Sequence, residues 1–233
     1  MRPHARGRVR ARVFVIVLTM AVLPGDAMAQ RGAGGDWRRQ ATPPDRSRLR
    51  AWRSAWTEAL DAARGDPAGI AAIARDPLFF DPDRVLTGAM PPAGDYDCRM
   101  VKLGRLGRVG AVYAVQDWSR CRIDGAGNHD DAGALRLTGL DGRQRPVGLL
   151  HPDTDARAIF LGSMTLADER PLDYGRDTGR DMAGIVERIG PGRWRLVLPR
   201  PAYQSILDLL ELRPVGQRDV ADAVADKAGS VAR

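Results

Sequence analysis

From residue 96 onward, the chain is a series of short β-like runs separated by turn residues such as Asp124-Gly125, Asp141-Gly142 and Pro152-Asp153. No helical pattern lies between these runs, which indicates an antiparallel sheet protein. The sequential order favours an up-and-down β-barrel of about eight strands, with a β-sandwich as the alternative. The expected strands are Tyr96–Leu103, Ala111–Asp117, Ser119–Ile123, Ala134–Leu140, Val147–His151, Ala158–Leu166, Met182–Ile189, Arg193–Leu198 and Leu207–Val215.

The stretch ERIGPGRWRLVLPRP, Glu187 to Pro201, predicts a hairpin around Gly190-Pro191-Gly192. Its second strand alternates, so that Trp194 and the two leucines after it point to one side. We expect that side to be the barrel interior and Trp194 to be a core anchor at the closed end. Arg193 and Arg195 are expected on the outside, facing water.

The residues before the barrel have helical periodicity. Thr42 and Asp45 form a capping-box pattern, and the apolar residues that follow recur at helical spacing until Gly65. A second short helix is expected from Asp66-Pro67 to about Arg75. The predicted organisation is a flexible N-terminus (30–41), a helical segment packed on the barrel (42–90), the barrel domain (91–215) and a flexible tail (216–233). The apolar spacing of Ile206–Leu212 would also suit a helix.

The first 29 residues have the pattern of a signal peptide. Five arginines precede an apolar run of eleven residues, Val13–Leu23, which is shorter than the about 20 residues of a membrane span. Small residues at Ala27 and Ala29 predict cleavage between Ala29 and Gln30. We therefore expect a periplasmic or secreted protein with no stable membrane span after cleavage.

Charge gives little support for a nucleic-acid partner. The formal net charge of +7 would fall to +3 on cleavage, because five arginines and Asp26 are removed. The remaining arginines are mixed with Asp and Glu, whereas a nucleic-acid surface needs clustered basic residues with aromatic platforms. We therefore expect no nucleic-acid partner.

Cys98 and Cys121 are the two cysteines of the chain, and they are 23 positions apart. An even number of cysteines in an exported protein predicts a disulfide, here between the first barrel strand and a neighbour. The alternatives are a redox pair or a metal pair. The absence of a C-x-x-C motif and of a nearby histidine disfavours both.

Recognisable catalytic motifs are missing from the sequence. It has no G-x-S-x-G, P-loop, H-E-x-x-H or dinucleotide fingerprint, so we expect no cofactor, metal or assigned catalytic residue. His129 is expected in a polar turn and His151 at the surface. Among carboxylates, Asp168, Glu169 and Glu187 stand out.

Glu187 falls on the apolar side of its strand, so burial would require a basic partner. Arg143, Arg145 or Arg195 could supply one, and Glu187, Arg145 and Arg195 form the speculative polar site. We favour a structural ion pair inside the barrel over a catalytic site.

Several phrases resemble one exported bacterial family, domain of unknown function 4893 (DUF4893). They are TPPDRSRLRAWRSAW, PPAGDYDCRMVKLG, GRQRPVGLLHPD, AIFLGSMTLADE, ERIGPGRWRLVLPRP and LDLLELRP. The resemblance spans about Thr42 to Pro214 and implies export and one domain architecture, with no activity to transfer. A weaker architectural likeness is to lipocalin-like barrels and barrel-shaped periplasmic protease inhibitors, and architecture alone does not give function.

These observations favour an exported, non-catalytic barrel that binds a protein partner or a small ligand. The alternatives are a carboxylate-based hydrolase acting on an envelope glycan and a structural envelope component. The barrel interior discriminates between the two kinds of binding. A filled interior indicates protein–protein binding, and an open apolar cavity at the barrel end indicates a small ligand.

Overall fold

The structure of the protein is a computed structural model that describes residues 36–107, 110–127, 133–202 and 205–216. The predictions for the signal peptide, for cleavage between Ala29 and Gln30, for His129 and for residues 217–233 lie outside these ranges. The strands are β1 (Gly94–Leu103), β2 (Tyr113–Val115), β3 (Ser119–Gly125), β4 (Leu135–Gly139), β5 (Gln144–Thr154), β6 (Arg157–Leu166), β7 (Asp181–Gly190), β8 (Arg193–Pro199) and β9 (Leu207–Pro214).

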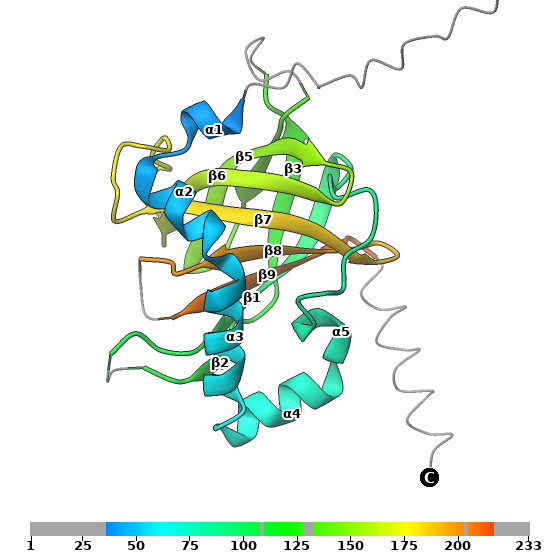
Figure 1. Ribbon diagram of the computed structural model, residues 1–233. Coiled ribbons are helices and arrows are strands. Elements are labelled where there is room, and N and C mark those ends of the chain that lie inside the picture. The colour runs from blue at the N-terminus through cyan, green and yellow to red at the C-terminus, as the bar shows by residue number, and fades with distance from the viewer. Residues whose placement is uncertain (1–35, 108–109, 128–132, 203–204, 217–233) are drawn as a thin grey trace, which may run out of the picture. The chain divides into compact units, whose positions relative to one another are not determined.

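The strands confirm the predicted up-and-down antiparallel barrel (Figure 1). Each strand from β3 to β9 pairs with the next one along the chain, and β9 pairs with β1 to close the sheet. β1 pairs with β3 through its first half and with β2 through its last three residues. The barrel is therefore eight strands with β2 added at one end of β1, and the sandwich alternative is wrong.

Side chains fill the barrel interior. Trp194, Leu196 and Leu198 point inward into one apolar cluster, and the Tyr96 and Trp194 rings meet edge to face at 6.2 Å. The Trp194 indole Nε1 donates a hydrogen bond to the carbonyl of Gly88 at 3.1 Å, which satisfies the one polar atom of this side chain.

Two glycines let the wall bend around a ring. Gly148 on β5 pairs with Gly162 on β6, and a Cβ at either position would come within 2.7 Å of the Phe160 ring. The ring therefore occupies the space that two side chains would otherwise need, which is a recognised device for curving a sheet.

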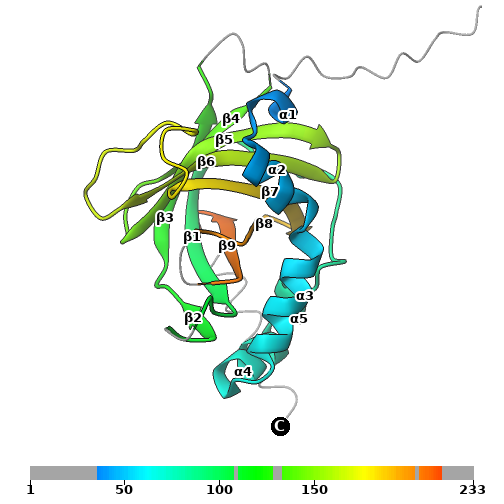
Figure 2. The same cartoon turned by 60° about the vertical axis from the view of Figure 1, so that its left-hand side comes forward.

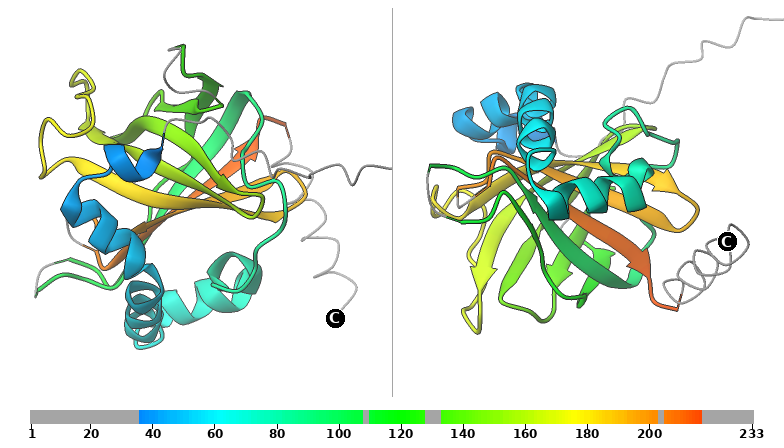
Figure 3. Two further views of the ribbon diagram at one scale, coloured as in Figure 1. Left: turned by 45° about the horizontal axis from the view of Figure 1, so that its top comes forward. Right: turned by 90° about the horizontal axis from the view of Figure 1, so that it is seen from below.

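A layer of helices covers one side of the barrel (Figures 1, 2 and 3). It packs through α2 against β7 and through α3 against β8, β9 and β1. The predicted single helix after Thr42 is broken at Ala51, where φ is −89° and ψ is 9°, and its two halves pack against different strands. The helices are α1 (Trp37–Gln40), α2 (Pro43–Arg50), α3 (Trp52–Ala63), α4 (Pro67–Arg75) and α5 (Pro77–Phe80).

Two helices differ from the sequence-based expectation. Residues 37–40 form α1, although 30–41 was predicted to be flexible, because the Trp37 indole donates a hydrogen bond to Asp153 at 2.9 Å. The sequence predicts no helix directly after Arg75, where Asp76-Pro77 follows. In the structure this dipeptide starts α5, with the Asp76 carboxylate as the N-cap.

The helical layer explains why β9 was ambiguous in sequence. Every residue of β9 except Pro214 is buried, because the barrel core lies on one face and α3 lies near the other. A strand buried on both faces loses its alternating pattern, so apolar spacing alone could not separate strand from helix.

The predicted Cys98–Cys121 disulfide is present and joins β1 to β3, with the two Cα atoms 5.9 Å apart. Both cysteines lie in the interior cluster. In the part of the chain that the structure describes, no helix is long and apolar enough to cross a membrane.

Candidate functional site

The barrel interior leaves little space for a ligand. A pocket at the barrel end, lined in part by Lys102 and Asp208, has a volume of about 20 Å³, which suits a single water molecule. Burial raises the pKa of Asp208, although Lys102, whose Nζ lies 2.7 Å from the carboxylate, opposes that shift. The outer wall of the barrel offers more space.

A larger cleft of about 370 Å³ lies between the helices and the outside of the barrel. Its walls come from α4 and α5 on one side and from β1, β2, β8 and β9 on the other. Arginine and aromatic residues dominate the lining, which is Ala72, Arg75, Asp76, Phe79, Phe80, Arg99, Val101, Tyr113, Val115, Arg193 and Arg213.

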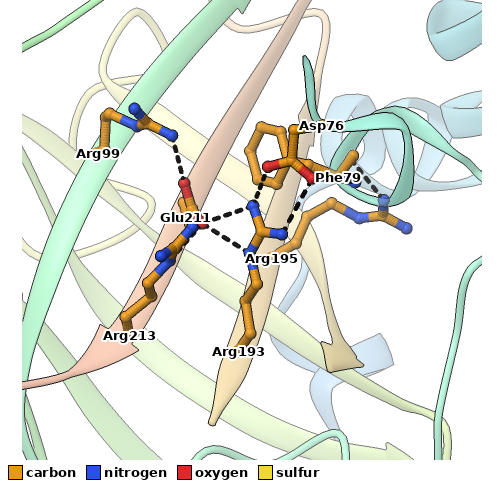
Figure 4. A network of polar contacts seen from close by, with 7 residues as sticks. All are labelled: Asp76, Phe79, Arg99, Arg193, Arg195, Glu211 and Arg213. Atoms are coloured by element: carbon orange, nitrogen blue, oxygen red, sulfur yellow. Dashed lines mark hydrogen bonds and ion pairs between the residues drawn. The ribbon is translucent and has the colours of Figure 1, made fainter. Parts of the chain in front are cut away.

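Glu211 on β9 organises the base of this cleft (Figure 4). Its side chain is fully buried and accepts hydrogen bonds from Arg99 Nη2 at 2.8 Å, Arg193 Nε at 2.7 Å and Arg213 Nε at 2.7 Å. Alternation brings these residues together, because each points outward from β1, β8 or β9. One carboxylate thus positions three guanidinium groups from three adjacent strands.

Arg193 also connects the barrel to the helical layer. Its Nη1 donates to Asp76 Oδ1 at 3.0 Å, and its Nη2 contacts Asp76 Oδ2. Burial alone would raise the pKa of Asp76, but the Arg193 hydrogen bonds and charge outweigh burial and lower it. Asp76 is therefore a stable carboxylate at neutral pH and a fixed partner of Arg193.

Positive charge remains in excess in the cleft. Arg75 makes no hydrogen bond or ion pair among the described residues, and it is exposed at the end of α4. The buried Nε of Arg99 has no hydrogen-bond partner there either. Burial raises the pKa of Tyr113, and the charges of Arg99 and Arg75 oppose that shift, so the phenol remains a neutral donor at pH 7.

The predicted polar site is only partly assembled. Glu187 and Arg195 are both fully buried and pair at 2.8 Å. Contrary to the expectation, the pair lies outside the barrel, beneath the helices, because both residues are on the odd-numbered outer face of the sheet. Arg145 is elsewhere and donates to the carbonyl of Glu169 at 2.9 Å.

Arg193 and Arg195 point outward from the barrel as expected, but the helical layer buries Arg195 completely and leaves Arg193 only 17% exposed, so the expected full contact with water is wrong. Arg195 donates to the carbonyls of Phe79 at 2.7 Å and Asp81 at 3.0 Å, and its guanidinium lies 4.5 Å from the Trp56 ring centroid. Burial lowers the pKa of Arg195, and the Glu187 charge opposes that change. The helical layer thus covers the outer face of β8, which the alternating sequence pattern predicts to be exposed to solvent.

The remaining candidates do not gather into a site. Glu169 pairs with Arg180 at 2.8 Å, Asp168 is exposed, and His151 is buried although a surface position was expected. No group of three or more His, Cys, Asp or Glu residues suited to a metal ion occurs among residues 36–107, 110–127, 133–202 and 205–216.

A protein-family model described as domain of unknown function (DUF4893) matches residues 37–212. This match covers most of the chain, including both sides of the cleft, and the chain belongs to this family. No curated protein matches the chain.

Proposed function

We propose that this member of the DUF4893 family is an exported, non-catalytic binding protein whose binding surface is the cleft centred on Glu211. The observation that carries the proposal is the excess of arginines around one buried carboxylate, at a concave surface between two layers of the fold. Clefts that combine apolar walls with a few fixed polar groups are the usual form of a binding site.

The filled interior supports an outer-wall site rather than a lipocalin-like lumen. Trp194, Phe160 and Tyr96 occupy the space that a lumenal ligand would need. The cleft between the helical layer and the outer wall does not depend on space inside the barrel.

A hydrolase is the weaker candidate. The carboxylates nearest the cleft are Asp76 and Glu211, and both are bound by Arg193. A general acid needs a carboxyl group whose pKa is raised towards neutrality, whereas the pKa of Asp76 is lowered. The cleft therefore favours binding over acid–base chemistry.

Export is part of the proposal, and the signal-peptide pattern and the Cys98–Cys121 disulfide support it. We expect the intact mass of the mature protein to begin at Gln30. A chain that is recovered from the native cell with residues 1–29 still attached would contradict export by cleavage.

Site-directed photo-crosslinking in the native cell tests the binding surface. A photoreactive benzoylphenylalanine replaces Val115, which is 48% exposed at the cleft rim, or Leu172, which is 49% exposed and lies outside the cleft lining. We expect a discrete adduct from position 115 and none from position 172. Equal adducts from both positions, or none from position 115, would overturn the proposed surface.

A further inference from the structure

We propose that the cleft binds a phosphate monoester carried by an apolar or aromatic body. This inference rests on the proposed function, because it names the ligand class of the same cleft. It depends on three observations, which are the charge balance of the lining, the hydrogen-bond donors left over, and the apolar wall beside them.

The charge balance favours a dianion. Arg75, Arg99, Arg193 and Arg213 contribute four positive charges, while Asp76 and Glu211 contribute two negative charges, which leaves a formal +2. A phosphate monoester carries about −1.5 to −2 at pH 7 and would neutralise this excess. A single carboxylate would neutralise only half of it.

The unused donors come from three different elements. Arg75 on α4 offers a whole guanidinium, Arg99 on β1 has a side chain that stays 30% exposed although Glu211 binds its Nη2, and Tyr113 on β2 offers a phenol. Planar guanidinium groups bind phosphate oxygens in pairs, and these bonds are stronger than neutral ones. Glu211 fixes Arg99 through its Nη2, so this donor is positioned before a ligand arrives.

The apolar part of the lining indicates that the ligand is larger than a free phosphate ion. Val115, which is 48% exposed, and the half-buried Tyr113 line the cleft beside the arginines, together with the buried Phe79 ring. The Arg193 guanidinium lies 5.3 Å from the Phe79 ring centroid, so charge and ring surface are adjacent. A phosphate joined to a ring or an alkyl group would use both surfaces.

Isothermal titration of the mature protein with three probes tests this inference. Phenyl phosphate carries the dianion and a ring, inorganic phosphate carries only the dianion, and benzoate carries a ring with a single negative charge. We expect affinity to fall in that order and to weaken as salt increases, because the contacts are charged and partly exposed.

Arg75→Gln is the matched variant, because it removes a cleft charge from a side chain with no partner among the described residues. We expect phenyl phosphate affinity to fall about tenfold, the value of one charge-assisted contact. Arg64→Gln is the control. Arg64 is likewise an exposed arginine at a helix end, lies outside the cleft lining and pairs only with exposed Asp61.

The outcomes separate ligand class from binding surface. Benzoate affinity equal to that of phenyl phosphate, or an equal loss of phenyl phosphate affinity in both variants, would overturn the phosphate assignment. Absence of binding by all three probes, together with a discrete crosslink from position 115, would overturn the ligand class and leave the surface standing. Absence of both would overturn the inference and the proposed function together.

Discussion

Arg193 and Arg195 stand two residues apart on β8, face the same helical layer and bind different carboxylates. Arg195 is fully buried, and its hydrogen bonds go to Glu187 and to carbonyls around α5. Arg193 is 17% exposed, shares Glu211 with two other arginines and lines a cleft. Arg195 thus joins the helical layer to the barrel in a fully buried contact, whereas Arg193 is part of a charged surface that solvent can reach.

The difference shows how one structural device can serve both stability and binding. A buried arginine contributes to stability only when carbonyls and a carboxylate replace its hydration, and Arg195 has these partners. Around Glu211 the arginines outnumber the acids, so some of their hydration must come from solvent or from a ligand. We therefore expect substitutions at the first cluster to change mainly stability, and those at the second to change mainly binding.

The largest effect is expected for Arg195→Met. This change leaves Glu187 buried with only Arg157 nearby, at 3.5 Å, and removes donors from the carbonyls of Phe79 and Asp81. Breaking a buried pair in this way costs about 3–5 kcal/mol of the free energy of unfolding. Urea denaturation measures this loss. The double variant Arg195→Met/Glu187→Leu should recover part of it, and a double variant that is less stable than the single would contradict the ion-pair explanation.

Glu211→Gln should lower the free energy of unfolding less than Arg195→Met does, and it should strengthen phenyl phosphate binding. It removes the charge that Arg99, Arg193 and Arg213 share, but these side chains are 10–30% exposed and can regain water. We expect a loss of about 1.5–3 kcal/mol, the range for hydrogen bonds to charged groups. The cleft charge rises from +2 to +3, so phenyl phosphate should bind more tightly. Weaker binding by a folded variant would show that Glu211 acts mainly by positioning the arginines.

The sequence predicted the barrel and the direction of each β8 side chain, because alternation and turn residues are local signals. It could not predict that Arg195 is buried, because its acceptors belong to residues 79 and 81, more than 110 positions away. Glu211 was missed, although it carried a signal. An acid within the apolar run LDLLELRP of a barrel strand requires a basic partner on an adjacent strand.

The contact between Arg193 and Asp76 should make the free energy of unfolding depend on pH in the acid range. Because the folded pKa of Asp76 is lowered, its contribution to stability is complete above the unfolded pKa of about 3.9 and is lost as pH falls through the folded value. Asp76→Asn should therefore lower stability at pH 6 and flatten the decline below about pH 4. Unfolding free energies between about pH 2 and pH 6 measure this change. An unchanged acid slope would contradict a carboxylate held by Arg193.

The smallest change in stability is expected for Arg75→Glu, with Arg64→Glu as its control. Both arginines lie at helix C-termini, where a positive charge is favourable, so each substitution should cost about 0.3–1 kcal/mol of unfolding free energy. The effects on binding should diverge. Arg75→Glu lowers the formal cleft charge from +2 to zero, whereas position 64 lies outside the cleft lining. We expect Arg75→Glu to abolish phenyl phosphate binding and Arg64→Glu to preserve it, with both proteins unfolding at nearly the same denaturant concentration. A loss of several kcal/mol of unfolding free energy in Arg75→Glu would show that the arginines of the cleft hold the helical layer to the barrel, as Arg195 does.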